Sequence, residues 1–130
     1  MIINAIPRLT LAAAKNSAKS EVNKKRDAII NSGIYLNDVL FDTDPESLRN
    51  ISYWHLQIIS GAVLPEGFMW RDANNIDHPA DEDFIKELSL AVTSRGTLIY
   101  QASWLHKANI DALNTFDEVK SYDISIGWPD

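Results

Sequence analysis

The longest stretch of helical hydrophobic spacing in the chain lies between Asp81 and Asn114. Its apolar residues recur at intervals of three, four and seven, so they share one face of a helix. They are Phe84, Leu88, Ala91, Leu98, Ala102, Leu105 and Ala112, with a second row at Ile85, Val92 and Ile99. The pattern predicts one long helix over residues 82–113. Gly96 interrupts the stripe, which indicates either a close helix contact or a kink.

Three shorter helices are predicted from capping residues and stop signals. They cover residues 11–31, 45–60 and 116–122. Thr10, Asp44 and Thr115 each precede one of these segments and can accept a hydrogen bond from its first turn. The helix over 45–60 is apolar nearly all round, so we expect it to be heavily buried.

Two short hairpins are predicted between the helices. Residues 34–36 and 39–41 flank a tight Asn37-Asp38 turn, and residues 72–75 form the second turn. An isolated hairpin is barely stable, which leaves open that the two join into one small sheet. The fold class is therefore α+β and mainly helical: a long central helix packed with shorter helices and two small β-hairpins. Helices should hold well over half of the residues.

The hydrophobic core is predicted where the two more apolar helices meet. Both must bury a wide face, and the shortest arrangement packs one face against the other. The predicted core residues are Phe84, Leu88, Val92, Leu98, Leu105, Ile51, Trp54 and Ile58. If Leu98 is buried in this way, its replacement by Ala should cost about 2–5 kcal/mol.

Composition narrows the class of protein. The 130 residues suffice for one domain, and the absence of cysteine excludes disulfides, zinc–thiolate sites and thiol nucleophiles. No run approaches the roughly 18 apolar residues of a membrane span, and the start lacks a signal-peptide pattern. We therefore expect a protein made in a cytoplasm and not placed in a membrane.

Charge is distributed unevenly along the chain. The net charge is −6, but residues 1–32 carry +4 and residues 33–130 carry −10. This division separates an N-terminal arm and basic helix (1–32) from a compact helical and hairpin domain (33–130). The basic helix either lies on the acidic body of its own chain or contacts another molecule.

No catalytic or metal-binding motif appears in the sequence. We predict that His55 is a hydrogen-bonded core residue. His78 is expected to pair with Asp77, and His106 with Asp111, on the solvent-exposed surface. The acids of residues 42–47 lack the glycine and the distant glutamate of a calcium loop. We therefore predict no enzymatic activity, no cofactor and no bound metal.

The acidic group Asp72, Asp77, His78 and Asp81 is the weak point of that prediction, because the second hairpin could bring its members together. The basic cluster Lys24-Lys25-Arg26 lacks the interleaved aromatic residues of a single-strand binder, and the acidic remainder would repel phosphates. No direct nucleic-acid binding is expected.

Several short segments, taken in order, resemble a bacteriophage and prophage domain of unknown function that occurs in tail-fibre proteins and in small proteins associated with them. The segments are residues 25–28, 41–47, 70–75, 99–108, 110–113, 115–119 and 127–129. The resemblance spans roughly residues 15–130. Similar sequences usually have an Asn-Gly turn where this chain has Asn37-Asp38, and Asp also tolerates that conformation.

The resemblance implies a non-enzymatic structural or adaptor component of a virion tail, associated with the tail fibre or baseplate. An alternative is a tail-fibre assembly chaperone; a nucleic-acid-binding or host-recognition protein is less favoured. The expected partners are phage tail fibre or baseplate proteins and further copies of this chain. The protein would be made in the host cytoplasm and located in the virion tail.

Residues 1–32 are predicted to be the assembly segment. The first six residues are mostly apolar with no following strand to pair with, and the helix after them is basic with small apolar residues. The tail should also be covered, either by this chain or by a partner. The predicted protein-interface residues are Ile2, Ile3, Ile6, Leu11, Ala14, Ala18, Lys24, Lys25, Arg26 and Trp128. The alternative is that the arm folds back on its own chain.

Overall fold

The computed structural model describes residues 10–130, so predictions on residues 1–9, including those for Ile2, Ile3 and Ile6, lie outside the described residues. The elements are α1 (Leu11–Ile30), β1 (Ile34–Leu36), β2 (Val39–Phe41), α2 (Pro45–Ile59), β3 (Met69–Arg71), β4 (Asp77–Pro79), α3 (Glu82–Asp111) and α4 (Phe116–Ser121). Helices hold 59% of the structure. The predicted fold class is confirmed, and the helix boundaries differ from the predicted ones by at most two residues.

Capping side chains start the helices as predicted. Thr10, Asp44, Asp81 and Thr115 each accept a hydrogen bond from the backbone N–H three residues later. Each bond satisfies one of the donors that a helix start leaves without a partner.

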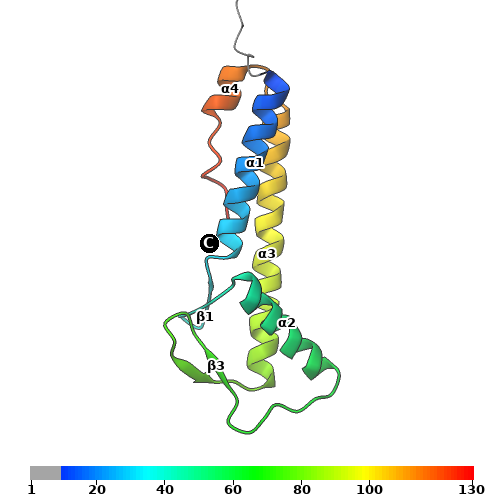
Figure 1. Ribbon diagram of the computed structural model, residues 1–130, viewed down its shortest axis with the longest axis vertical. Helices are drawn as coiled ribbons and strands as arrows, with labels where there is room; N and C mark the ends of the chain where they lie inside the picture. Colours follow the sequence, from blue (N-terminus) through cyan, green and yellow to red (C-terminus); the bar gives the residue numbers. More distant parts are fainter. Residues whose placement is uncertain (1–9) are drawn as a thin grey trace, which may run out of the picture.

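α3 is the axis of an elongated molecule (Figure 1). Its 30 residues correspond to roughly 45 Å of helix. α1 runs antiparallel beside the C-terminal half of α3, while α2 and the hairpins gather around the N-terminal half. The predicted boundary at residue 32 thus falls between α1 and β1, two elements that both contact α3.

The face of α3 that packs against α1 differs from the predicted one. Ile99, Ser103, His106 and Ile110 are buried, whereas Leu98 is 53% exposed and Leu105 63% exposed. The prediction that Leu98 and Leu105 belong to the core is wrong. These four buried residues also follow a three-four spacing, but two of them are polar.

The reason lies in α1, which has small or medium residues at its contact face. Ala14 and Val22 are its two buried residues, and a helix with such short side chains packs close to its neighbour. Neighbouring residues on a helix lie about 100° apart, so turning Ile99 toward α1 turns Leu98 toward solvent.

A second cluster of buried residues lies at the other end of α3. Ile34, Phe41, Ile51 and Leu88 form it. Phe84, Val92 and Trp70 pack against its edge, and Ile58 is also buried. The predicted core is therefore confirmed for Ile51, Ile58 and Leu88, and Phe84 and Val92 contribute at its rim, while Trp54 is half-buried.

α2 is less buried than its composition predicts. Tyr53, Leu56 and Ile59 are between 57% and 66% exposed, and only Ile51 and Ile58 are buried. The helix leaves α3 at an angle, so its outer side receives no cover from the rest of the described chain (Figure 1).

The hairpins form as predicted but do not merge. β1 pairs with β2 across the two-residue turn Asn37-Asp38, and both turn residues have positive φ, as a type I′ turn requires. β3 pairs with β4 as a separate two-stranded sheet. A backbone hydrogen bond of 2.8 Å from Ala73 to Leu40 links the two hairpins, which stay separate sheets.

Gly96 neither breaks α3 nor makes room for a close neighbour. The helix continues through it, and a Cβ built at this position meets no other atom within 4 Å. It borders a small cavity of about 110 Å³ that Ile30, Leu48 and Ile99 also line. A methyl group would therefore fit.

Gly96→Ala should raise the free energy of unfolding by about 0.5–1 kcal/mol, because glycine in a helix interior carries an entropic cost that alanine lacks. Thermal unfolding followed by circular dichroism measures the change. Gly33→Ala is the matched control and should destabilise, since Gly33 has φ of +95° and its Cβ would lie 2.8 Å from Leu40 Cδ1. Equal effects of the two substitutions would contradict this account.

Candidate interaction surfaces

Large apolar side chains line the side of α3 that faces away from α1. We name these residues the outer face of α3: Leu90, Leu98, Trp104 and Leu105. Each is between 53% and 67% exposed. Four large apolar side chains exposed on one side of one helix give this face the character of an interaction surface.

The outer face of α3 also carries no charge. Between Glu87 and Lys107 the only charged residue of the helix is Arg95. Arg95 points to the side, where its guanidinium donates to Ser32 Oγ at 3.2 Å and to the backbone oxygen of Asp130 at 3.1 Å. The exposed positions between the named residues are uncharged polar ones, Ser94, Thr97 and Gln101. The sequence contains this signal, but the prediction placed Leu98 and Leu105 in the core.

A second apolar row lies on α2. We name Tyr53, Leu56 and Ile59 the α2 row, after the exposure described above. Tyr53 and Leu56 also border a shallow, open hollow together with Leu48. The α2 row is separate from the outer face of α3, so the described chain offers two apolar surfaces on two helices.

The predicted interface residues of α1 occupy different environments. Ala14 is buried against this chain and is therefore unavailable to a partner, and Leu11 and Ala18 are half-buried. Two bases of the helix reach α3: Lys15 Nζ donates to the backbone oxygen of Asp111 at 2.7 Å, and Lys19 pairs with the Asp111 carboxylate at 2.8 Å. This part of α1 lies on the body of its own chain.

The cluster Lys24-Lys25-Arg26 is only partly free. Lys24 is exposed and pairs with Glu21 at 3.1 Å, and Lys25 is exposed. Arg26 is mostly covered, because its guanidinium lies over the ring of Tyr100 with 5.0 Å to the ring centroid. Its cation is thus engaged within the molecule.

Trp128 is covered by this chain, through a buried histidine. Its ring stacks on His106 with centroids 5.2 Å apart, and its Nε1 donates to the backbone oxygen of Ile124 at 2.7 Å. His106 lies 2.7 Å from both the Tyr122 hydroxyl, through Nδ1, and the Ile126 backbone oxygen, through Nε2. Because a carbonyl oxygen only accepts, Nε2 donates to Ile126. The prediction that His106 faces solvent near Asp111 is wrong.

His78 also has a different partner from the predicted one. Its Nε2 lies 2.7 Å from the carboxylate of the buried Asp72, while Asp77 pairs with Arg71 at 2.8 Å. The hydrogen bond from His78, together with the backbone N–H groups of Ile76 and Asn74, lowers the pKa of Asp72 below its usual range. Asp72 therefore organises the turn of the second hairpin.

The remaining histidine and acid contacts are structural. His55 Nδ1 lies 3.0 Å from Ser89 Oγ, which ties α2 to α3 as the prediction of a hydrogen-bonded histidine requires. Asp81 caps α3 and does not join Asp72. Among residues 10–130, no three His, Asp or Glu side chains are placed to hold a metal ion, and no helix has the length and apolar character to cross a membrane.

Comparison with known proteins gives one match. Residues 13–126 match a family model whose description is Domain of unknown function (DUF4376). No curated protein matches the chain, and no solved structure matches it either.

Proposed function

The chain belongs to the DUF4376 family, whose function is unknown. We propose that it is a non-enzymatic structural component of a bacteriophage tail, an adaptor associated with the tail fibre or baseplate. The link to phage tails rests on the sequence resemblance described above. The protein would be made in the host cytoplasm and located in the virion tail, with no nucleic-acid or membrane partner.

The observation that supports an assembly role best is the uncharged outer face of α3. Leu90, Leu98, Trp104 and Leu105 each expose more than half of their surface on one rigid helix. Covering what remains exposed of each would contribute roughly 1–2 kcal/mol before association costs. Covering this apolar surface in a complex therefore lowers the free energy relative to the isolated molecule, where water contacts it.

A second copy of this chain is the occupant we propose for the outer face. Leu90 and Leu105 lie at nearly equal distances along the sequence from Leu98. Two antiparallel copies related by a two-fold axis near Leu98 would therefore place Leu90 of one next to Leu105 of the other. The net charge of −6 opposes self-association in general, whereas the four residues of the outer face are themselves uncharged.

Introducing charge on this face tests the proposal. The untagged protein should sediment as an oligomer in analytical ultracentrifugation, and Leu98→Glu with Leu105→Glu should give a folded monomer, because two unpaired carboxylates would be buried in each copy. Leu56→Glu on the α2 row is the matched control and should leave the oligomer intact. A monomeric wild-type protein, or an oligomer that survives the double substitution, contradicts the proposal.

A tail-fibre assembly chaperone is the second candidate function. The α2 row favours it, since an exposed apolar row on a projecting helix suits contact with an incompletely folded client. Mass spectrometry of purified virions separates the two candidates. A structural component is present at a fixed ratio to the fibre, whereas a chaperone is absent from the finished particle.

The N-terminal arm remains a predicted contact for a neighbouring copy or the tail machinery. Its residues Ile2, Ile3 and Ile6 precede the described part of the chain. α1 cannot be removed with the arm in a deletion experiment, because Val22 is buried against α3. A deletion that ends at residue 9 leaves this contact in place.

A further inference from the structure

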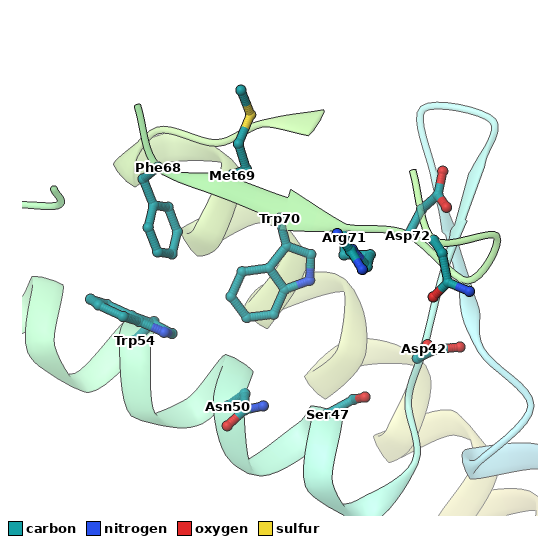
Figure 2. A pocket seen from close by; sticks show the side chains of 10 residues that line it. Asp42, Ser47, Asn50, Trp54, Phe68, Met69, Trp70, Arg71 and Asp72 are labelled. Carbon is teal, nitrogen blue, oxygen red and sulfur yellow. The ribbon is translucent and has the colours of Figure 1, made fainter. Parts of the chain in front are cut away.

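An open cleft lies between α2 and the hairpin of β3 and β4 (Figure 2). Its volume is about 400 Å³, enough for a small ligand. Trp54, Phe68 and Trp70 form its aromatic part, and Asp42, Asn50 and Arg71 are among its polar residues. No residue of α3 lines this cleft, so it is separate from the outer face of α3.

The three aromatic rings form a continuous apolar wall. The centroids of Trp54 and Phe68 are 4.8 Å apart, and those of Phe68 and Trp70 are 6.3 Å apart. In Figure 2, Phe68 and Trp70 point from the hairpin toward α2, while Met69 points the opposite way. All three rings are half-buried, so each keeps part of its surface available to a ligand.

Polar groups beside this wall have no partner within residues 10–130. The side chains of Asn50 and Asp42 take part in no hydrogen bond there, nor do the indole N–H groups of Trp54 and Trp70. Arg71, by contrast, donates two hydrogen bonds to Asp77, at 2.8 and 3.2 Å. The cleft therefore presents free donors and one free carboxylate around an aromatic wall.

We infer that this cleft binds a neutral saccharide. The face of an aromatic ring is electron-rich and attracts the weakly positive C–H groups on one face of a pyranose ring. The hydroxyl groups of a sugar both donate and accept, so they satisfy the Asp42 carboxylate and the Asn50 amide together. An anionic ligand is disfavoured, because Asp42 and Asp72 line the cleft and the single guanidinium is already paired with Asp77.

A proline-rich peptide is the main competing ligand, since aromatic grooves also bind polyproline helices. Proline has no N–H to donate, and its carbonyl oxygens only accept. Such a segment offers no donor of its own to the Asp42 carboxylate, whereas a sugar hydroxyl does. The unpaired donors and the Asp42 carboxylate in the cleft therefore favour a saccharide over a proline-rich peptide. The inference is independent of the proposed tail function and can fail without it.

The four tryptophans provide the readout. In ¹H–¹⁵N spectra of the full chain, each gives one indole N–H signal. Methyl glycosides and short neutral oligosaccharides of glucose, galactose and N-acetylglucosamine are the probes. Binding should shift the signals of Trp54 and Trp70 and leave those of Trp104 and Trp128 in place, with millimolar affinity for the tightest probe.

Asn50→Ala should weaken the binding of that probe about three- to tenfold, the loss expected for one or two hydrogen bonds. Asn50 is exposed on α2, and alanine favours a helix, so the fold should persist. Asn16→Ala, at an exposed position of α1, is the matched control and should bind like the wild type. The inference is overturned if no saccharide shifts Trp54 and Trp70 at tens of millimolar, if a proline-rich peptide alone shifts them, or if Asn50→Ala changes nothing.

Discussion

Replacing Leu88 with Ala should lower the free energy of unfolding by about 2–5 kcal/mol, whereas replacing Leu98 with Ala should cost about 1 kcal/mol. Both are leucines in the same helix, and alanine suits a helix equally well at both positions. Leu88 is completely buried beside Phe41 and Ile51, so its truncation leaves a cavity. Leu98 is half-exposed, so its truncation leaves no cavity.

Urea unfolding of the two variants measures this difference. The experiment should be run below the concentration at which the chain self-associates, because covering Leu98 in an oligomer would raise the apparent cost of its loss. Comparable losses at both positions would show that Leu98 packs in the core of the single chain. That result would mean that α3 buries the face of Leu98 and Leu105 and not the face of Ile99 and His106.

Replacing His106 with Ala should cost about 2–4 kcal/mol and release the C-terminal tail. The buried ring contributes a stacking surface for Trp128 and bonds to Tyr122 and Ile126. Its removal takes the histidine partner from the Ile126 oxygen and leaves the Tyr122 hydroxyl with the Asn109 amide alone. Cleavage by chymotrypsin after Tyr122 should therefore accelerate in the folded variant.

His55→Ala is the matched control for this substitution. His55 is half-buried and makes one hydrogen bond, to Ser89, so its loss should cost about 1 kcal/mol and leave the tail protected. If His106→Ala has no greater effect than His55→Ala, or if its tail stays resistant to cleavage, the tail is held by other contacts.

Local structure could be predicted from the sequence because its causes are local. Thr10, Asp44, Asp81 and Thr115 begin the four helices through hydrogen bonds that span only three residues. The Asn37-Asp38 turn sets the register of its hairpin for the same reason. None of these features depends on which distant segment packs against them.

The buried face of α3 could not be predicted in this way. Two stripes compete on the helix: Leu98 and Leu105 are more hydrophobic, while Ser103 and His106 are the residues actually buried. The choice depends on α1, which packs against α3, and on the C-terminal segment, which gives His106 two hydrogen-bond partners. Hydrophobicity alone does not predict the burial of a polar side chain whose loss of water is offset by hydrogen bonds to another element.

The candidate surfaces were missed for the same reason. A prediction that places Leu98 and Leu105 in the core treats the charge-free run between Glu87 and Lys107 as buried, so it does not identify this run as an interaction surface. The cleft of Trp54 and Trp70 depends on how the second hairpin lies over α2, where Asp72 and His78 fix the turn. Adjacency in sequence pairs His78 with Asp77 instead.

The position of the last residue has a practical consequence for labelling. Arg95 binds the backbone oxygen of Asp130 and the hydroxyl of Ser32, so the chain ends midway along the rod, where Asp130 and Leu98 border the same hollow (Figure 1). A fluorescent protein or affinity tag joined after residue 130 would emerge beside Leu98 and shield the middle of the outer face of α3. Self-association through the outer face of α3 should therefore be measured on the untagged chain.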